Sequence, residues 1–160
     1  DLYEGGHHVP FLVRWPGITK PGVSSSLVSQ IDFMATFAEA LDFELPKAAA
    51  EDSVSLLPVL KDPSRSVRST YVHCSHREEF AIRYRDWILI LAGDGYVSSR
   101  NGEWESKRDY SADDTGPVEL YNLADDIGQR TNLASRHPEK VREMKGKIRR
   151  DCGKKVGKSG

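Results

Sequence analysis

Residues 3–17 read Tyr3-Glu4-Gly5-Gly6-His7-His8-Val9-Pro10-Phe11-Leu12-Val13-Arg14-Trp15-Pro16-Gly17. The adjacent glycines permit a tight turn and a close approach of the backbone that a Cβ would hinder. The apolar run 11–15 shows little polar alternation, which is typical of a strand buried on both faces of an α/β sheet. Loops that end at a strand often carry binding residues. The stretch therefore predicts an α/β fold with a candidate site just before a strand.

The region after this strand contains one clear helical pattern. Apolar residues recur at helical spacing over 33–41 and give a stripe that other structure must cover. Asp32 stands where a carboxylate can cap that helix. The sequence 48–53 reads as an exposed linker, and Asp62-Pro63 reads as a turn. We therefore place a domain boundary after residue 62.

The second part of the chain carries the pattern of a small antiparallel sheet. Short β-branched and aromatic runs separated by polar turns are expected to form strands. These runs are 70–73, 80–84, 87–91 and 118–123. Arg85-Asp86 is the tightest connection, and 93–116 is expected to be an irregular insertion. A final helix is expected to start near Pro138, to lay a narrow apolar face on the sheet and to end at Gly153 and Gly157.

Composition limits the possible partners. The 160 residues carry 23 Lys plus Arg against 24 Asp plus Glu, a net charge of −1, which provides no general field for nucleic acid. No apolar run approaches the ~20 residues needed to span a membrane. Cys74 and Cys152 are too few for a disulfide framework or a zinc pair, and we expect both to be free. Basic residues gather over 147–158, which we interpret as a solvated helix face and a frayed end; a polyanion-binding tail is the alternative.

The opening stretch resembles the sulfatase family, in which a Lys-containing segment runs into Glu-Gly-Gly-x-Arg-x-Pro and a strand closed by Trp-Pro-Gly. Further strings occur in the order seen at the C-terminal end of bacterial arylsulfatase-like proteins of the alkaline phosphatase superfamily. They are Gln30-Ile31-Asp32-Phe33-Met34-Ala35-Thr36, Glu51-Asp52-Ser53-Val54-Ser55-Leu56-Leu57-Pro58, Phe80-Ala81-Ile82-Arg83, Glu119-Leu120-Tyr121-Asn122-Leu123 and Thr131-Asn132-Leu133. The resemblance implies that the chain is the C-terminal portion of a sulfatase.

This resemblance also implies a fold and a domain organisation. The fold class is α/β, or α+β for the fragment taken alone. Residues 1–62 would be the end of the large α/β sheet domain. Residues 63–152 would be a small antiparallel sheet domain with a packed C-terminal helix, and 153–160 a flexible tail.

The chemistry of the family resembles a metal-assisted hydrolysis of sulfate esters by a formylglycine, made from Cys or Ser in a Cys/Ser-x-Pro-x-Arg segment. That segment is absent from this sequence, and the family's metal ligands lie upstream of the matching part. The resemblance implies that the chain supplies no catalytic residue, binds no metal or other cofactor and is inactive alone. Formylglycine and calcium (or magnesium) would belong to the parent protein. Its remainder and its sulfate ester would be the partners, and the family suggests a periplasmic or secreted location.

Several residues are candidates for the rim of the substrate pocket. They are Glu4, His7, His8, His73 and His76. Glu4 is expected to orient the glycine loop, and an imidazole can donate to a sulfate oxygen. Because adjacent residues on an extended chain point to opposite sides, we expect only one of His7 and His8 to face the pocket. The family more often has Arg at position 8, so His8 lacks a permanent charge and a bidentate fork.

Other residues match family positions with structural roles. They are Gly5, Gly6, Asp32, Thr36 and Arg83. Asp32 and Thr36 resemble a helix-start pair, and the Arg83 guanidinium is expected to tie the small domain to the larger one. A metal site at His73, Cys74 and His76 is disfavoured, because a strand places them on two faces and no fourth ligand has the spacing of a zinc site.

Two other interpretations remain open at this point. The parent could be a related phosphodiesterase or phosphonate hydrolase, which shares the metal platform. Alternatively, the chain could be a non-catalytic module that binds a sulfated polysaccharide or a partner chain. An uncovered strand edge and helix face also predict self-association of the fragment.

Overall fold

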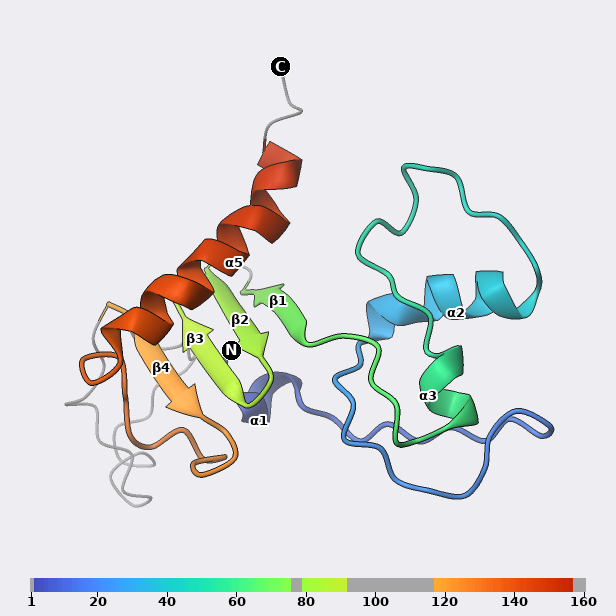
Figure 1. Ribbon diagram of the computed structural model, residues 1–160, viewed down its shortest axis with the longest axis horizontal. Helices are drawn as coiled ribbons and strands as arrows, with labels where there is room; N and C mark the ends of the chain where they lie inside the picture. The colour runs from blue at the N-terminus through green and yellow to red at the C-terminus, as the bar shows by residue number, and fades with distance from the viewer. Residues whose placement is uncertain (1, 76–78, 92–116, 157–160) are drawn as a thin grey trace. The chain divides into compact units, whose positions relative to one another are not determined.

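The computed structural model describes residues 2–75, 79–91 and 117–156, with side chains up to residue 148 in the last range. The chain divides into two compact units (Figure 1). The first, here the sheet unit, combines Asp1–Val9 with Thr70–Gly160, and the second, the helical unit, is Pro10–Ser69. The sequence placed a single boundary after residue 62, whereas the first nine residues group with the sheet.

The sheet unit is built on four antiparallel strands in the order β1-β2-β3-β4. These are β1 Thr70–Cys74, β2 Phe80–Tyr84, β3 Trp87–Ile90 and β4 Glu119–Asn122. Each agrees with a predicted run to within one residue. The β2–β3 connection is the expected two-residue turn, since Tyr84 pairs with Trp87 and Arg85 adopts a positive φ of 56°.

Alternation along the strands gives the sheet two apolar faces. One face carries Ala81, Ile88 and Ile90, which pack with Leu2 of the N-terminal segment. The other carries Ile82 and Leu89 and packs against the last helix. The sheet is therefore covered on one side by the start of the chain and on the other by its end.

Helix α5, Pro138–Val156, runs along the sheet, as Figure 1 shows. Met144 and Ile148 are the buried residues of this helix that pack on the sheet. The Lys147 ammonium lies over the Tyr84 ring, 3.8 Å from its centroid. Pro138 stands at its first position, where the missing amide has no cost. The helix continues through Gly153 and ends at Val156, directly before Gly157, the second of the two glycines expected to end it.

The helical unit contains the 3-10 turn η1 Gln30–Asp32, α2 Phe33–Ala40 and α3 Leu57–Lys61. Helix α2 confirms the predicted apolar pattern over 33–41. Its buried face carries Thr36 and Ala38, while Met34 and Phe37 are each 56% exposed. Much of the predicted stripe is thus left uncovered by the unit itself.

The predicted strand over 11–15 is absent from the structure, and the segment has no regular secondary structure. A strand requires a neighbouring strand to pair with its backbone. Among the described residues, no segment supplies one. The apolar pattern that predicted a buried strand is nevertheless present and lies at the surface.

Within the described ranges, none of the helices combines the length and apolar composition needed to cross a bilayer.

Removing the buried anchor of α5 should destabilise the sheet unit. Met144 is fully buried between the helix and the sheet, so Met144→Ala is expected to lower the free energy of unfolding by about 2–5 kcal/mol. Arg142→Ala, on an exposed position of the same helix, should change it by less than about 0.5 kcal/mol. Urea denaturation followed by circular dichroism measures both, and equal shifts would contradict the packing described.

Candidate functional site

The candidate site lies on the face of the sheet that the N-terminal segment covers. In the strand register, His73 pairs with Ala81 and Tyr71 with Arg83, so these side chains share the face on which Leu2 packs. The short helix α1, Glu4–His7, follows Leu2 in the chain. The sheet therefore presents His73 and Arg83 on the face against which the segment carrying Glu4 packs.

Glu4 is the centre of this cluster, with only 4% of its surface exposed. Arg83 Nη1 donates to Glu4 Oε1 at 3.0 Å. His8 Nδ1 lies 2.9 Å from Oε2, and His7 Nε2 lies 3.6 Å from Oε1, too far for a hydrogen bond. The Glu4 backbone N–H donates to Gln129 Oε1 at 2.7 Å. Both the side chain and the backbone of Glu4 are thus held by the sheet unit.

The charge of Glu4 follows from these contacts. Burial alone would raise the pKa of the carboxyl group, but the contact with His7 and the positive charge of Arg83 outweigh burial and lower the pKa to about 2. Glu4 is therefore ionised at neutral pH and acts only as an acceptor. The same guanidinium also donates from Nε to the Arg85 carbonyl at 3.0 Å. Arg83 joins the N-terminal segment to β2 within a single unit.

The two adjacent histidines differ in exposure. They stand at the end of a helical turn rather than on an extended chain, and both approach the same carboxylate. The His8 side chain is 66% exposed and that of His7 is 26% exposed. Because His8 turns Nδ1 to Glu4, Nε2 is the ring nitrogen left to face outward. His8 is thus the more accessible imidazole of the pair.

His73 lies beneath His7, with ring centroids 4.1 Å apart, and stacks on Tyr71 at 5.8 Å. Its Nε2 is 3.3 Å from the Leu2 carbonyl oxygen, which can only accept a hydrogen bond. Burial, with the neighbouring His7, lowers the pKa of His73 to about 4. The ring is therefore neutral at pH 7 with its proton on Nε2. Nδ1 is a buried acceptor without a partner among the described residues.

A second polar cluster lies on the same face and was not predicted. Glu119, fully buried on β4, accepts from Tyr3 Oη at 2.8 Å and Tyr121 Oη at 2.7 Å. Burial and the nearby Glu119 carboxylate raise the pKa of the Tyr121 hydroxyl. One feature of the sequence could have revealed this cluster: the spacing of Glu119 and Tyr121 places both side chains on one face of a strand. Gln129 gave no comparable signal.

The Asp32 and Thr36 pair lies in the helical unit and is fully engaged in local bonds. Asp32 accepts from the backbone N–H groups of Ser29 at 2.9 Å and Val54 at 3.0 Å, and from Arg68. Thr36 Oγ1 donates to the Asp32 carbonyl and accepts from Leu56 N–H at 2.9 Å. Asp32 stabilises the 3-10 turn before α2 and makes no side-chain cap bond to α2 itself. These contacts support a structural role for the pair.

The remaining predicted residues are less informative. Neither Gly5 nor Gly6 has a positive φ, and a Cβ on Gly5 would meet no atom within 4 Å. Cys74 is an exposed free thiol. His76, the insertion 93–116 and the Cys152 side chain fall outside what the structure describes. Within the described part of the chain, no three His, Cys, Asp or Glu side chains converge in a way that could hold a metal ion.

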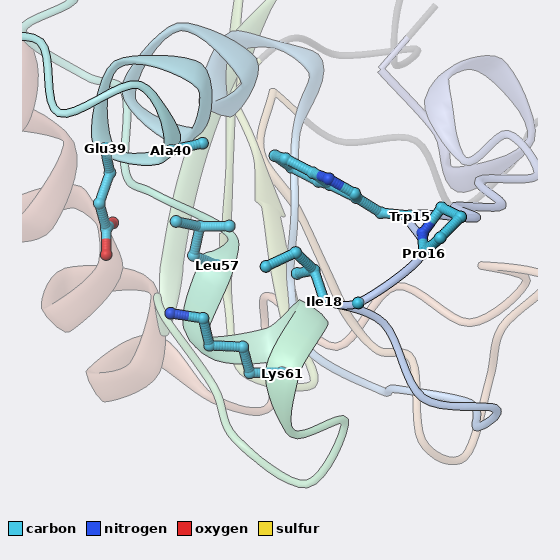
Figure 2. A pocket seen from close by; sticks show the side chains of 8 residues that line it. Trp15, Pro16, Ile18, Glu39, Ala40, Leu57 and Lys61 are labelled. Atoms are coloured by element: carbon cyan, nitrogen blue, oxygen red, sulfur yellow. The ribbon is translucent and has the colours of Figure 1, made fainter.

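The helical unit has an open pocket, shown in Figure 2. It is lined by Trp15, Pro16, Gly17, Ile18, Glu39, Ala40, Leu57 and Lys61. The charged groups of the lining, Glu39 and Lys61, belong to exposed residues. The pocket therefore lacks the buried polar groups that would fix a ligand.

Comparison with known proteins matches this chain to sulfatases. The family model described as Sulfatase matches residues 1–43. An N-acetylgalactosamine-6-O-sulfatase of Bacteroides thetaiotaomicron is 35% identical over 144 residues, which cover 90% of this chain and 27% of that protein. The family model and these relatives support the interpretation of the chain as a C-terminal portion of a sulfatase.

Further relatives show how much of a sulfatase the chain matches. An uncharacterised sulfatase of Escherichia coli, YdeN, is 31% identical over 93% of this chain and 30% of its own length. A solved structure from work on glycosaminoglycan metabolism by Bacteroides thetaiotaomicron has a TM-score of 0.74 at 31% identity, covering 92% of this chain and 29% of that one. The chain thus spans less than a third of these relatives.

Neutralising Glu4 should weaken the attachment of the N-terminal segment. Glu4→Gln leaves Arg83 without its carboxylate, so we expect a loss of about 1–3 kcal/mol at pH 7. The pKa of Glu4 lies near 2 in the folded chain, against an ordinary value near 4.5. The free energy of unfolding of the wild type should therefore fall as the pH drops from about 4.5 to about 2. Glu4→Gln should lack this pH-dependent loss. Urea titrations from pH 7 to pH 2 test this. Glu139→Gln, at a 68% exposed side chain, is the matched control and should change little.

His73 should titrate well below an ordinary histidine. Since its folded pKa is about 4 against 6.5, the unfolded chain binds more protons between these values. The His73 contribution therefore makes stability fall as pH drops from about 6.5 to about 4. NMR titration of the His73 ring protons should give a midpoint near pH 4, and a midpoint near 6.5 would refute the buried, neutral ring.

Proposed function

We propose that this chain is the C-terminal part of a sulfuric ester hydrolase of the arylsulfatase type, in which it provides scaffold and the rim of the substrate pocket. The Glu4 cluster is the observation that supports this role. A buried, ionised carboxylate holds one exposed and one half-buried imidazole at a fixed place on the sheet unit. Such positioned N–H groups are suited to contact an anionic or hydroxylated substrate.

His8 is the residue of the cluster that we assign to substrate contact. Its outward Nε2 can accept from a hydroxyl group, or donate to a sulfate oxygen when the ring is protonated. The Arg83 charge is neutralised by Glu4 at 3.0 Å and is not available for this purpose. His7 and His73 would act as positioning residues beneath His8, while His76 stays a candidate for the rim. His8 stands where the family more often has Arg, so this contact lacks the permanent charge and the bidentate fork of a guanidinium.

The chain alone should not hydrolyse a sulfate ester. In the parent, a formylglycine with calcium or magnesium would supply the nucleophile and the charge stabilisation. Nucleophile, metal and acid act as a unit, and binding groups alone do not replace it. The part of the reaction that we assign to this chain is orientation of the ester.

The ester class is open between aryl and carbohydrate sulfates. The Bacteroides relative is named for a carbohydrate sulfate, so we favour a sulfated sugar. A phosphodiesterase or phosphonate hydrolase remains the alternative from the same superfamily. A non-catalytic module that binds a sulfated polysaccharide is the other. Substrate tests must therefore include a phosphate diester and sulfated polysaccharide.

A chimera tests the proposal directly. The 160-residue chain replaces the matched region of the Bacteroides N-acetylgalactosamine-6-O-sulfatase, and hydrolysis of N-acetylgalactosamine 6-sulfate, an aryl sulfate and a phosphate diester is measured. The chimera should hydrolyse a sulfate ester, whereas the isolated chain should not. His8→Ala should lower kcat/KM by roughly 10- to 100-fold, the effect of losing one charged hydrogen bond. His137→Ala, on the opposite face near Trp87, serves as the matched control.

Several outcomes would contradict this proposal. Sulfatase activity of the isolated chain would show that the reacting centre lies within it. Preference for the phosphate diester would favour the alternative enzyme class. Equal activity of His8→Ala and His137→Ala would remove His8 from the substrate site. Salt-sensitive retention of the isolated chain on heparin without activity in the chimera would favour the binding module.

A further inference from the structure

Helix α5 concentrates the positive charge of the chain. It carries eight lysines and arginines against three acidic residues, whereas the whole chain has a net charge of −1. The rest of the chain is therefore acidic. A positive field that is confined to one helix attracts an anionic partner to one place on the molecule.

Two lysines of this helix lie against aromatic rings of the sheet. The Lys147 ammonium is 3.8 Å from the centroid of the Tyr84 ring. The Lys140 ammonium is 5.9 Å from the same centroid and 5.8 Å from that of Trp87. Arg85 adds a third positive charge, with Cζ 5.5 Å from the Tyr84 centroid. These five residues are here called the basic cluster.

The basic cluster has more positive charge than its acidic neighbour balances. Lys140 Nζ donates to Glu143 Oε2 at 2.7 Å, and Lys147 Nζ lies 3.9 Å from Oε1 of the same carboxylate. The hydrogen bond from Lys140, joined by the positive charges of the cluster, lowers the pKa of Glu143. Within the described part of the chain, no other carboxylate pairs with these three cations. One negative charge thus stands against three positive ones.

The two lysines are restrained but still reach solvent. The side chain of Lys140 is 26% exposed and that of Lys147 is 20% exposed. Each rests partly on an aromatic ring, as long basic side chains do when their apolar part is covered and their charge stays at the surface. Because an ammonium group has three N–H donors, both lysines can bind an incoming anion while they stay paired with Glu143.

We propose that the basic cluster is an accessory binding site for a sulfated polysaccharide, separate from the Glu4 cluster. Alternation along β2 places Tyr84 on the face of the sheet that packs against α5, whereas Arg83 contacts Glu4 on the opposite face. A ligand bound here therefore leaves the site assigned to His8 open. The proposal rests on the proposed function only for the choice of sulfate over other anions.

The arrangement suits a sulfated chain better than a small anion. The three cations converge on one ring and can share a sulfate group, and the Arg85 guanidinium presents a fork that fits such an anion. Trp87 is partly exposed and offers apolar surface beside them. Beyond Lys147, α5 continues to Val156 with basic residues in excess. A polymer can continue along this part of the helix, whereas a small anion gains nothing from it.

Binding of heparin by the 160-residue chain tests the proposal without catalysis. Isothermal titration calorimetry should detect binding that weakens as salt is added, and weaker binding of hyaluronan, which carries carboxylates but no sulfate. Lys140→Met combined with Lys147→Met removes both ammonium groups and keeps the aliphatic stems. This cluster variant should bind heparin roughly 10-fold more weakly or worse. Lys20→Met combined with Lys47→Met, at exposed positions of the helical unit, is the control of equal charge and should bind like the wild type.

A variant that strengthens binding provides a second test that does not depend on the stability of the cluster variant. Glu143→Gln removes the one carboxylate of the cluster at a 41% exposed side chain, so it should tighten heparin binding by roughly threefold or more. Glu139→Gln makes the same change of charge on the same helix, at a 68% exposed side chain, and should have a smaller effect. Equal effects of the two variants would assign binding to the overall charge of the helix and overturn the cluster.

The other outcomes separate the possible sites and ligands. Wild-type affinity in the cluster variant, with binding lost in Lys154→Met combined with Lys155→Met, would move the site to the end of α5 and overturn the proposal. Single-stranded nucleic acid can use the same combination of cations and rings. Equal affinity for a single-stranded DNA oligonucleotide would therefore overturn the choice of ligand.

The chimera distinguishes this proposal from the proposed function. A chimera that hydrolyses a sulfate ester, together with a chain that does not bind heparin, would overturn the accessory site and leave the proposed function in place. Heparin binding that the cluster variant loses, together with an inactive chimera, would count against the proposed function and leave the accessory site in place.

Discussion

A carboxylate that is removed from water must find positive charges or hydrogen-bond donors, and Glu4 meets this constraint in the sheet unit. Its partners are Arg83 and His8, with His7 nearby. Removing any of them leaves a buried charge less compensated, which costs more than the pair contributes when intact. The constraint fixes helix α1 on one face of the sheet. The positions of both histidines follow from that attachment.

The helical unit uses a second buried carboxylate in a comparable way. Asp32 is fully buried and joins the turn before α2 to the segments around Val54 and Arg68. These contacts fix the N-terminal end of α2 and hold the helix to the segments around Val54 and Arg68, although no extensive apolar core surrounds it. The apolar groups of α2 are then free to point outward. The buried contacts of Asp32 therefore hold α2 in place while its apolar side chains stay exposed.

Sequence patterns predicted the strands and the turn at Arg85-Asp86 because these depend on local alternation and turn chemistry. They did not predict that 11–15 would lack strand structure, since pairing depends on a partner that a local pattern does not specify. The roles of Glu119 and Gln129 were missed for a related reason. Each contacts a residue far away in the sequence, as Gln129 does with Glu4. The resemblance to sulfatases brought attention to Glu4 and His8, but the contacts between them required coordinates.

The order of segments along the chain has a consequence for how the protein is made. The sheet unit is interrupted by the helical unit, so Asp1–Val9 is synthesised well before the strands that hold it. The Glu4 to Arg83 contact closes a separation of 79 residues, and contacts of this kind form late. During synthesis on the ribosome, residues 1–9 therefore cannot complete their contacts with the sheet until β4 has emerged. During that interval their apolar side chains are exposed to chaperones and to misassembly.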